Sequence, residues 1–160
     1  MDSAWLEGLR HCGLRLDGEG RWWHEGELVV HSRLVQALHR WLDRLEDGRF
    51  IVRTDERLYA YVEVDDAPYI VRRVKLEDAR NGDHRLMLEL SDDSSEELDY
   101  ATLTEGASSA LYCQVKGRFD ARFGRSAQQT LAPLLREVSG GFALRAGGNL
   151  WPIGVRGEHA

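Results

Sequence analysis

The sequence is poor in cysteine and proline and contains no long apolar run. Its two cysteines, Cys12 and Cys113, are too few for a disulfide framework, and no CxxC pair is present to bind zinc. No apolar stretch approaches the roughly 20 residues of a membrane-spanning helix. Residues 1–5 also lack the basic and apolar regions of a secretory signal. We therefore expect a cytoplasmic protein that holds no metal and enters no membrane.

Positive charge is also in deficit. The chain has 21 lysine and arginine residues against 27 aspartate and glutamate residues, which gives a net charge of −6. Nucleic-acid-binding proteins usually concentrate basic residues on one face, because neutralised phosphates supply most of their affinity. Here the basic residues are scattered along an acidic chain. We therefore expect neither nucleic acid nor an anionic membrane surface as a partner.

Motifs for common cofactors and catalytic centres are missing as well. The glycines follow neither the dinucleotide-binding pattern nor the P-loop pattern, and no zinc-protease or nucleophile-elbow motif occurs. The sequence therefore predicts no cofactor. Its 42% hydrophobic residues are still enough for a buried core.

An α+β pattern runs through the first part of the chain. Alternating apolar residues predict hairpins over 14–24 and 49–64. Between them, apolar residues at helical spacing predict one helix, with Ser32 as its N-cap and Asp47-Gly48 as its end. The first part thus reads hairpin, helix, hairpin.

The middle of the chain predicts two more strands and an acidic loop. The strands cover 69–76 and 85–90, and Asn81-Gly82 between them is a favoured turn pair. Residues 91–97 are acidic and polar, and such a run of like charge is typical of a solvated loop.

The last third repeats the first. It predicts a hairpin over 111–123, a helix with a capping box of Ser126 and Gln129, and a closing hairpin over 142–153. Pro133 should kink this helix or shift its start, because its ring clashes with the preceding turn. Many apolar positions of the two halves match at an offset of 92 residues, as Phe50 matches Phe142. A constant offset of this kind indicates an internal duplication.

Three segments give the chain a recognisable resemblance. They are GRWWHEG at 20–26, DGRFIVRT at 47–54 and VEVDDAPY at 62–69. In order and spacing they resemble the bacterial domain-of-unknown-function family 1285. The resemblance implies two similar subdomains, each a curved antiparallel sheet with one helix, that face a cleft. It also implies a small, nucleotide-like ligand and a role in signalling. We place the two duplicated subdomains at 1–80 and 81–160.

Polar and aromatic residues on the predicted strands are the candidates for the ligand site. Arg53 and Arg145 hold equivalent places in the repeat, and guanidinium groups match the geometry of carboxylate and phosphate. Glu63 and Asp65 share one face of a strand, where they could bind hydroxyl or cationic groups. The alternative for each of these residues is a purely structural role. The predicted ligand-binding set is Trp23, His24, Arg53, Thr54, Glu63, Asp65, Tyr69 and Arg145.

Three functions remain open from the sequence. The first is a non-enzymatic protein that binds a small molecule in a signalling or regulatory role. The second is an enzyme for a small anionic substrate, in which His24 acts as the acid–base group beside Glu63 or Asp65, because imidazole titrates near neutral pH. His24 could instead only brace its hairpin. The third is a protein-interaction module with an exposed aromatic patch. The oligomeric state is left open.

Overall fold

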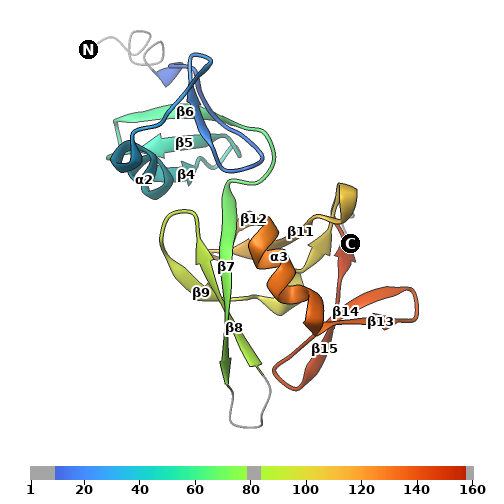
Figure 1. Cartoon of the computed structure of the whole chain (residues 1–160). Coiled ribbons are helices and arrows are strands. Elements are labelled where there is room, and N and C mark those ends of the chain that lie inside the picture. Colours follow the sequence, from blue (N-terminus) through green and yellow to red (C-terminus); the bar gives the residue numbers. More distant parts are fainter. Residues whose placement is uncertain (1–9, 79–83, 158–160) are drawn as a thin grey trace. The chain divides into compact units, whose positions relative to one another are not determined.

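The computed structural model of the protein describes residues 10–78 and 84–157. Two predictions concern residues outside these ranges: the lack of a secretory signal at residues 1–5 and the turn at Asn81-Gly82. The chain forms two compact units, Met1–Pro68 and Tyr69–Ala160 (Figure 1). This division differs from the predicted boundary at 80/81, because the strand that begins at Tyr69 pairs entirely within the second unit.

The first unit contains one six-stranded sheet in the order β3-β2-β1-β6-β5-β4. All neighbours are antiparallel except β1 and β6, which are parallel. The sheet is therefore mixed, and the prediction of a purely antiparallel sheet is wrong for this pair. The strands are β1 (Leu14–Leu16), β2 (Trp22–His24), β3 (Glu27–Leu28), β4 (Leu42–Arg44), β5 (Phe50–Arg53) and β6 (Tyr59–Val64).

The first unit has one described α-helix, α2 (Ser32–Trp41), which packs against β5. It is shorter than predicted at its C-terminal end, because Leu42 leaves the helix and pairs with Val52 of β5 as part of β4. Ser32 is the first helical residue, and the N-cap is His31, whose side chain makes no capping hydrogen bond. The predicted Ser32 cap is therefore wrong.

The core of the first unit is built around Trp22, which is fully buried. Its indole Nε1 donates to the imidazole of His39, 3.2 Å from Nδ1, and the two rings meet edge to face. His39 is 1% exposed, so this contact gives a buried polar ring a hydrogen-bond partner. The surrounding apolar core consists of Leu16, Leu38, Leu42, Ile51, Val52 and Val62.

The second unit contains a seven-stranded sheet and a separate three-stranded sheet. The larger sheet has the order β16-β10-β11-β12-β7-β8-β9, with parallel pairs at β10–β16 and β12–β7, and the smaller one is β13-β14-β15. The strands are β7 (Tyr69–Asp78), β8 (His84–Leu90), β9 (Ser95–Glu97), β10 (Thr104–Glu105), β11 (Leu111–Val115), β12 (Phe119–Phe123), β13 (Leu135–Val138), β14 (Gly141–Ala146), β15 (Asn149–Pro152) and β16 (Gly154–Val155).

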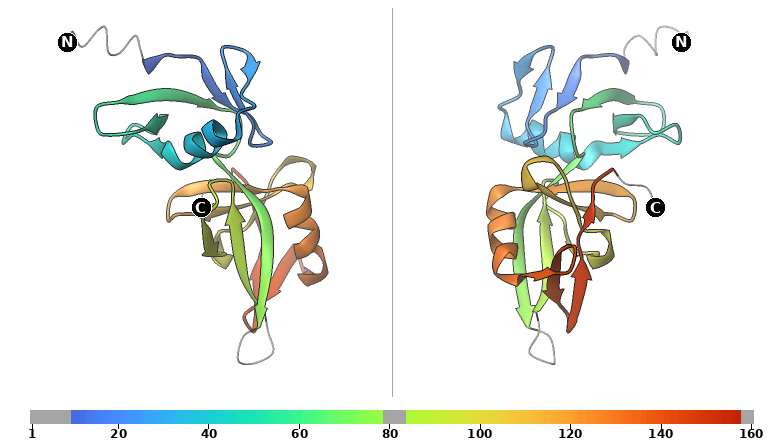
Figure 2. Two further views of the ribbon diagram at one scale, coloured as in Figure 1. Left: turned by 60° about the vertical axis from the view of Figure 1, so that its left-hand side comes forward. Right: turned by 90° about the vertical axis from the view of Figure 1, so that its right-hand side faces the viewer.

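The helix of the second unit, α3 (Arg125–Leu131), packs against β7 and β12 of the larger sheet (Figure 2). The predicted capping box is not formed, because the N-cap is Gly124 and no side chain caps the helix. Beyond Leu131 the chain tightens into a 3₁₀ turn, η3 (Ala132–Leu134), that contains Pro133. Proline lacks the N–H that would continue the α-helix, so the helix ends there and β13 follows.

The acidic segment 91–97 is only in part the predicted solvated loop, because Asp93 is exposed in a bend while Ser95–Glu97 forms a strand. Ser91 is buried, and its Oγ accepts a hydrogen bond of 3.0 Å from the Ile70 amide. Asp92 pairs with Lys116 at 2.8 Å, and Ser95–Glu97 forms β9 at the edge of the sheet. These partners come from distant positions, which explains why charge pattern alone did not reveal them. The short 3₁₀ turns η1 (Tyr100–Thr102) and η2 (Ala107–Ser109) follow.

The two units share an order of elements. Each has three antiparallel strands (β1–β3 and β10–β12), then a helix, then three further antiparallel strands, and in each the chain finally pairs in parallel with the first strand of the set. The turns before the third strands, Glu25-Gly26 and Lys116-Gly117, both have positive φ at their two residues, 50° and 83° against 52° and 78°. The second unit adds β7, β8 and β9 beside β12.

Candidate functional site

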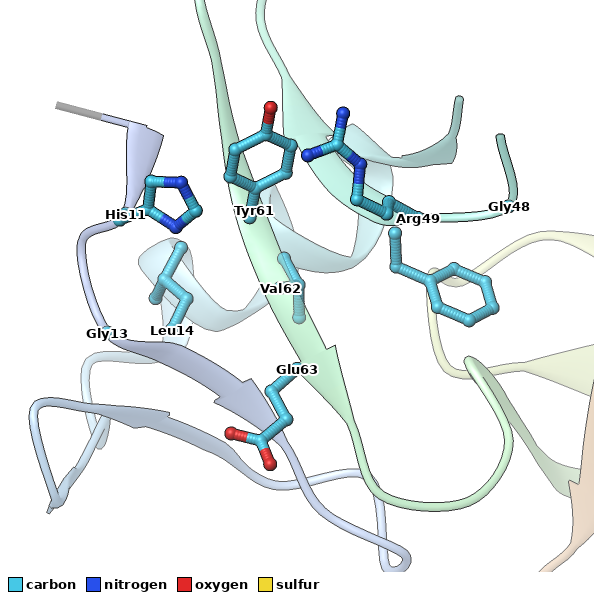
Figure 3. A pocket seen from close by; sticks show the side chains of 9 residues that line it. His11, Gly13, Leu14, Gly48, Arg49, Tyr61, Val62 and Glu63 are labelled. Carbon is cyan, nitrogen blue, oxygen red and sulfur yellow. The ribbon is translucent and has the colours of Figure 1, made fainter. Parts of the chain in front are cut away.

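A groove of about 550 Å³ opens on the sheet of the first unit. It follows β6, whose first half pairs with β5 and whose second half pairs with β1. Because β1 begins only at Leu14, opposite Val62, the segment before β1 borders the groove without joining the sheet. The lining residues are His11, Gly13, Leu14, Gly48, Arg49, Phe50, Tyr61, Val62 and Glu63 (Figure 3).

Tyr61 is the central planar group of the groove. Its ring lies between the His11 imidazole and the Arg49 guanidinium (Figure 3). The His11 and Tyr61 ring centroids are 4.6 Å apart, and the Arg49 Cζ lies 4.4 Å from the Tyr61 centroid. A cation at this distance is attracted by the quadrupole of the ring. The row of three planar groups brings a positive charge and two aromatic rings to one end of the groove.

Asp47 fixes the position of Arg49. The Arg49 Nε pairs with Asp47 Oδ2 at 2.8 Å, and the Arg49 amide donates to Asp47 Oδ1 at 3.0 Å. The hydrogen bond from this amide, with the ion pair, lowers the pKa of Asp47, and the hydrogen bond to Asp47 raises the pKa of Arg49. Asp47 and Gly48 form the turn before β5, so this local turn orients the guanidinium over Tyr61.

Glu63 supplies the negative charge of the groove. It follows Tyr61 by two positions on β6, so both side chains lie on the same face of the strand. In Figure 3 its carboxylate lies toward the other end of the groove from Arg49. The groove therefore offers a cation at one end and an acceptor of hydrogen bonds at the other.

Of the predicted binding residues in the first unit, Glu63 lines this groove and the others have different surroundings. Trp23 donates from its indole Nε1 to Asp17 at 2.9 Å, and Asp65 pairs with Arg15 at 2.6 Å. Arg53 pairs with Asp43 at 3.4 Å, and Thr54 donates from its amide to the Leu58 carbonyl oxygen.

His24 lies exposed at the end of β2, opposite Glu27 in the strand register. Within residues 10–78 its side chain forms no ion pair with a carboxylate, and it does not line the groove. The geometry that an acid–base role requires, an imidazole bonded to a carboxylate inside a cavity, is thus not formed around His24 there. His24 stays a prediction as a ligand contact.

The remaining two predicted residues belong to the second unit. Tyr69 is 3% exposed, pairs with Ala121 and meets the Phe119 ring edge to face at 5.4 Å. It is a core residue of that unit. Arg145 is exposed on β14, opposite Leu150.

The predicted set did not contain His11, Arg49 or Tyr61, although the sequence pattern around Tyr61 and Arg49 could have indicated these two. Tyr61 stands two positions before Glu63, and a period of two along a strand places both on one face. Arg49 follows the turn pair Asp47-Gly48. His11 precedes the first strand in an irregular segment, and nothing in the local pattern places it beside Tyr61.

Comparison with known proteins then places the fold. No family model matches the sequence, and no curated protein does. Two crystal structures do match. A DUF1285 family protein from Silicibacter pomeroyi DSS-3 superposes with a TM-score of 0.73 at 20% identity, over 91% of this chain and 81% of that one. The chain has the DUF1285 fold.

A second DUF1285 family protein, from Shewanella baltica OS155, superposes with a TM-score of 0.57 at 15% identity, over 76% of this chain and 91% of that one. The resemblance of the three sequence segments to this family is thus confirmed by the fold. DUF1285 denotes a domain of unknown function, so the two matches identify the fold and assign no activity.

Among residues 10–78 and 84–157, no group of three or more His, Cys, Asp or Glu side chains is arranged to hold a metal ion. No helix in these ranges combines the length and the apolar character needed to cross a membrane.

Proposed function

We propose that the protein binds a small, anionic, nucleotide-like molecule in the groove along β6, in a regulatory role without catalysis. The observation that carries this proposal is the row of His11, Tyr61 and Arg49 at one end of the groove, with Glu63 toward the other. A cavity of about 550 Å³ falls in the range of small-molecule sites.

The groups of the groove match the parts of such a ligand. The Arg49 guanidinium pairs with a phosphate or carboxylate, and its planar face, like the imidazole of His11, stacks on an aromatic base. The Glu63 carboxylate accepts hydrogen bonds from hydroxyl or amino groups, as a sugar would present them. Ligands that carry only one of these features should bind more weakly than ligands that carry all three.

The shared order of elements supports a duplication as the origin of the two units. Both units have one parallel pair that involves the first strand of the set, β1–β6 and β10–β16, and matching turns before the third strand. Under this proposal the units would have diverged after the duplication, since the second carries β7–β9 and distributes its strands over two sheets.

A thermal-shift screen with nucleotides, nucleotide second messengers and phosphorylated metabolites tests the proposal. A bound ligand should raise the melting temperature in a concentration-dependent way. Arg49→Ala and Glu63→Gln should each weaken the affinity for the ligand about tenfold or more, since a charge-assisted hydrogen bond contributes roughly 1.5–3 kcal/mol. Each variant should then need a correspondingly higher ligand concentration for the same rise in melting temperature.

Arg145→Ala is the matched control, because it removes an exposed arginine from the other unit. It should leave the response unchanged. Loss of the response in Arg145→Ala or Arg53→Ala, with Arg49→Ala unaffected, would favour the residues predicted from the repeat over the groove. Lack of any shift with the whole set would contradict the proposal and favour a protein partner.

A further inference from the structure

A second cavity, of about 390 Å³, lies in the second unit at the junction of β12 and α3. Two of its lining residues are arginines, Arg122 and Arg125, and none is acidic. In a chain of net charge −6, such a cavity is a local concentration of positive charge. The lining residues are Ser108, Ala110, Arg122, Phe123, Arg125, Gln128, Gln129 and Ala132.

The junction that carries the two arginines is fixed by Gly124. Its amide donates to the Val71 carbonyl oxygen of β7 at 2.9 Å. A Cβ at this position would lie 3.2 Å from that oxygen, a tight contact, so the close approach of the two backbones favours glycine. Arg122, next to last in β12, and Arg125, the first residue of α3, lie on either side of Gly124.

Ser108, which lines the cavity, belongs to a loop that Gln128 holds by hydrogen bonds. Ser108 and Ser109 both have left-handed backbone conformations, with φ of 57° and 61°. The Gln128 side chain fixes this loop, because Nε2 donates to the Ser109 carbonyl oxygen at 2.8 Å and Oε1 accepts from the Leu111 amide at 3.2 Å. Adjacent non-glycine residues in this conformation persist only where surrounding contacts hold them, and they cluster at binding sites.

Arg125 has no ion-pair partner within the described part of the chain, residues 10–78 and 84–157. Arg125 and Gln129 are both exposed residues that line the cavity. Together with the Ser108 hydroxyl and Arg122, these side chains provide many N–H and O–H donors on a fixed frame. Such a donor set suits an anion with several oxygens.

We propose that this cavity binds a small phosphomonoester. The phosphate would accept hydrogen bonds from Arg122, Arg125 and Gln129, and Ala110 and Ala132 would border a small organic group. This site belongs to the second unit and shares no lining residue with the groove along β6. This proposal can therefore be tested independently of the proposed function.

The test is a ¹H–¹⁵N NMR titration of the full chain with glycerol 3-phosphate and, separately, inorganic phosphate, at constant ionic strength. Saturable shifts are expected for the amides of residues 108–111 and 124–129. Arg125→Gln should weaken binding about tenfold, because it removes a charged donor and leaves the backbone frame intact. Arg145→Gln removes another exposed arginine of the same unit and should leave the affinity unchanged.

Gln129→Ala serves as a second variant, and it should weaken binding without changing the charge. The spectrum of each variant without ligand reports whether it is folded. Tighter binding of glycerol 3-phosphate than of inorganic phosphate would support an organic ligand, and equal binding would restrict the site to the phosphate group. Equal weakening by Arg125→Gln and Arg145→Gln, or shifts that do not saturate, would overturn the proposal.

Discussion

The indole Nε1 of Trp23 donates a hydrogen bond of 2.9 Å to Oδ2 of Asp17. Asp17 is buried at the turn between β1 and β2, and it also accepts from the amides of Glu19 and Arg21 and from the Arg21 Nε. Burial by itself raises the pKa of this carboxyl. The four hydrogen bonds, first that from Trp23, outweigh burial and lower the pKa of Asp17 to about 2.

Asp17 should therefore make the stability of the first unit depend on pH. A pKa lowered from 3.8 to about 2 corresponds to roughly 2 kcal/mol in favour of the folded state. Because the folded pKa is the lower one, this stabilisation is complete above about pH 4 and is lost as pH falls toward 2. Asp17→Asn should cost about 2 kcal/mol in urea unfolding at pH 7, with a difference that shrinks in acid.

Asp78→Asn is the control for this prediction. The Asp78 side chain is 92% exposed, so its removal should change the unfolding free energy little at either pH. A cost for Asp17→Asn that stays constant from pH 7 to pH 3 would show that packing, and not the charge, makes Asp17 important.

Trp22→Phe should destabilise the first unit by about 1–3 kcal/mol. The substitution removes the N–H that faces the buried His39 imidazole and leaves a small void in a fully buried position. Trp41→Phe is the matched change at a tryptophan that is 38% exposed, and it should cost much less. Chemical denaturation of both variants gives the comparison, and equal costs would argue against a role for the Trp22–His39 contact.

Gly124→Ala should destabilise the second unit by about 1–3 kcal/mol, because the new Cβ would press on the Val71 carbonyl oxygen at 3.2 Å. Gly154→Ala provides the control, since a Cβ there would meet its nearest neighbour, Thr104 Cγ2, at an ordinary 3.6 Å. Thermal unfolding of the two variants measures the difference. A neutral Gly124→Ala would mean that β7 and α3 can separate slightly without loss.

Cys113 should be inert to thiol reagents in the folded protein. It is 2% exposed, and burial, followed by the nearby charges of Glu96, Asp99 and Asp120, raises the pKa of its thiol. Since the thiolate is the reactive form, a Cys12→Ser variant should show no fast-reacting thiol until it is unfolded in guanidinium. Rapid labelling of the folded variant would show that β11 opens readily.

Much of the fold follows from local patterns, and two of the exceptions share one physical cause. The strands predicted at 69–76 and 85–90 and the hairpins of both units are present. Helical spacing continued past Trp41, but Leu42 pairs with Val52 in β4, and a ladder between distant residues overrides a local period. The same holds for β9, whose partner strand β8 decides its conformation.

The constant offset of 92 predicted for the two halves does not hold across their last hairpins, because the two turns differ in length. Arg53 pairs with Tyr59 across five intervening residues, whereas Arg145 pairs with Leu150 across four. A constant offset of 92 therefore matches Tyr59 to Trp151, although the ladder makes Leu150 its counterpart. Turn length is a local choice that apolar patterns do not record.

The candidate groove was only partly accessible to sequence reasoning. The strand period predicts that Glu63 shares a face with Asp65 at the ligand site, but in the structure Glu63 lines the groove with Tyr61, and Asp65 pairs with Arg15. Arg15, the partner of Asp65, belongs to the parallel strand β1. The position of β1 beside β6 is a long-range feature, so the local sequence does not show which of the two acids forms the salt bridge.

The parallel pairing of β1 with β6 has a consequence for synthesis of the chain. Leu14 is made 48 residues before its partner Val62, and β6 is the last strand of the first unit to leave the ribosome. Until then the three strands β1–β3 and the pair β4–β5 are separate pieces with open edges. Because β6 lies between β1 and β5, the strand that is synthesised last is the one that joins the two pieces into a single sheet.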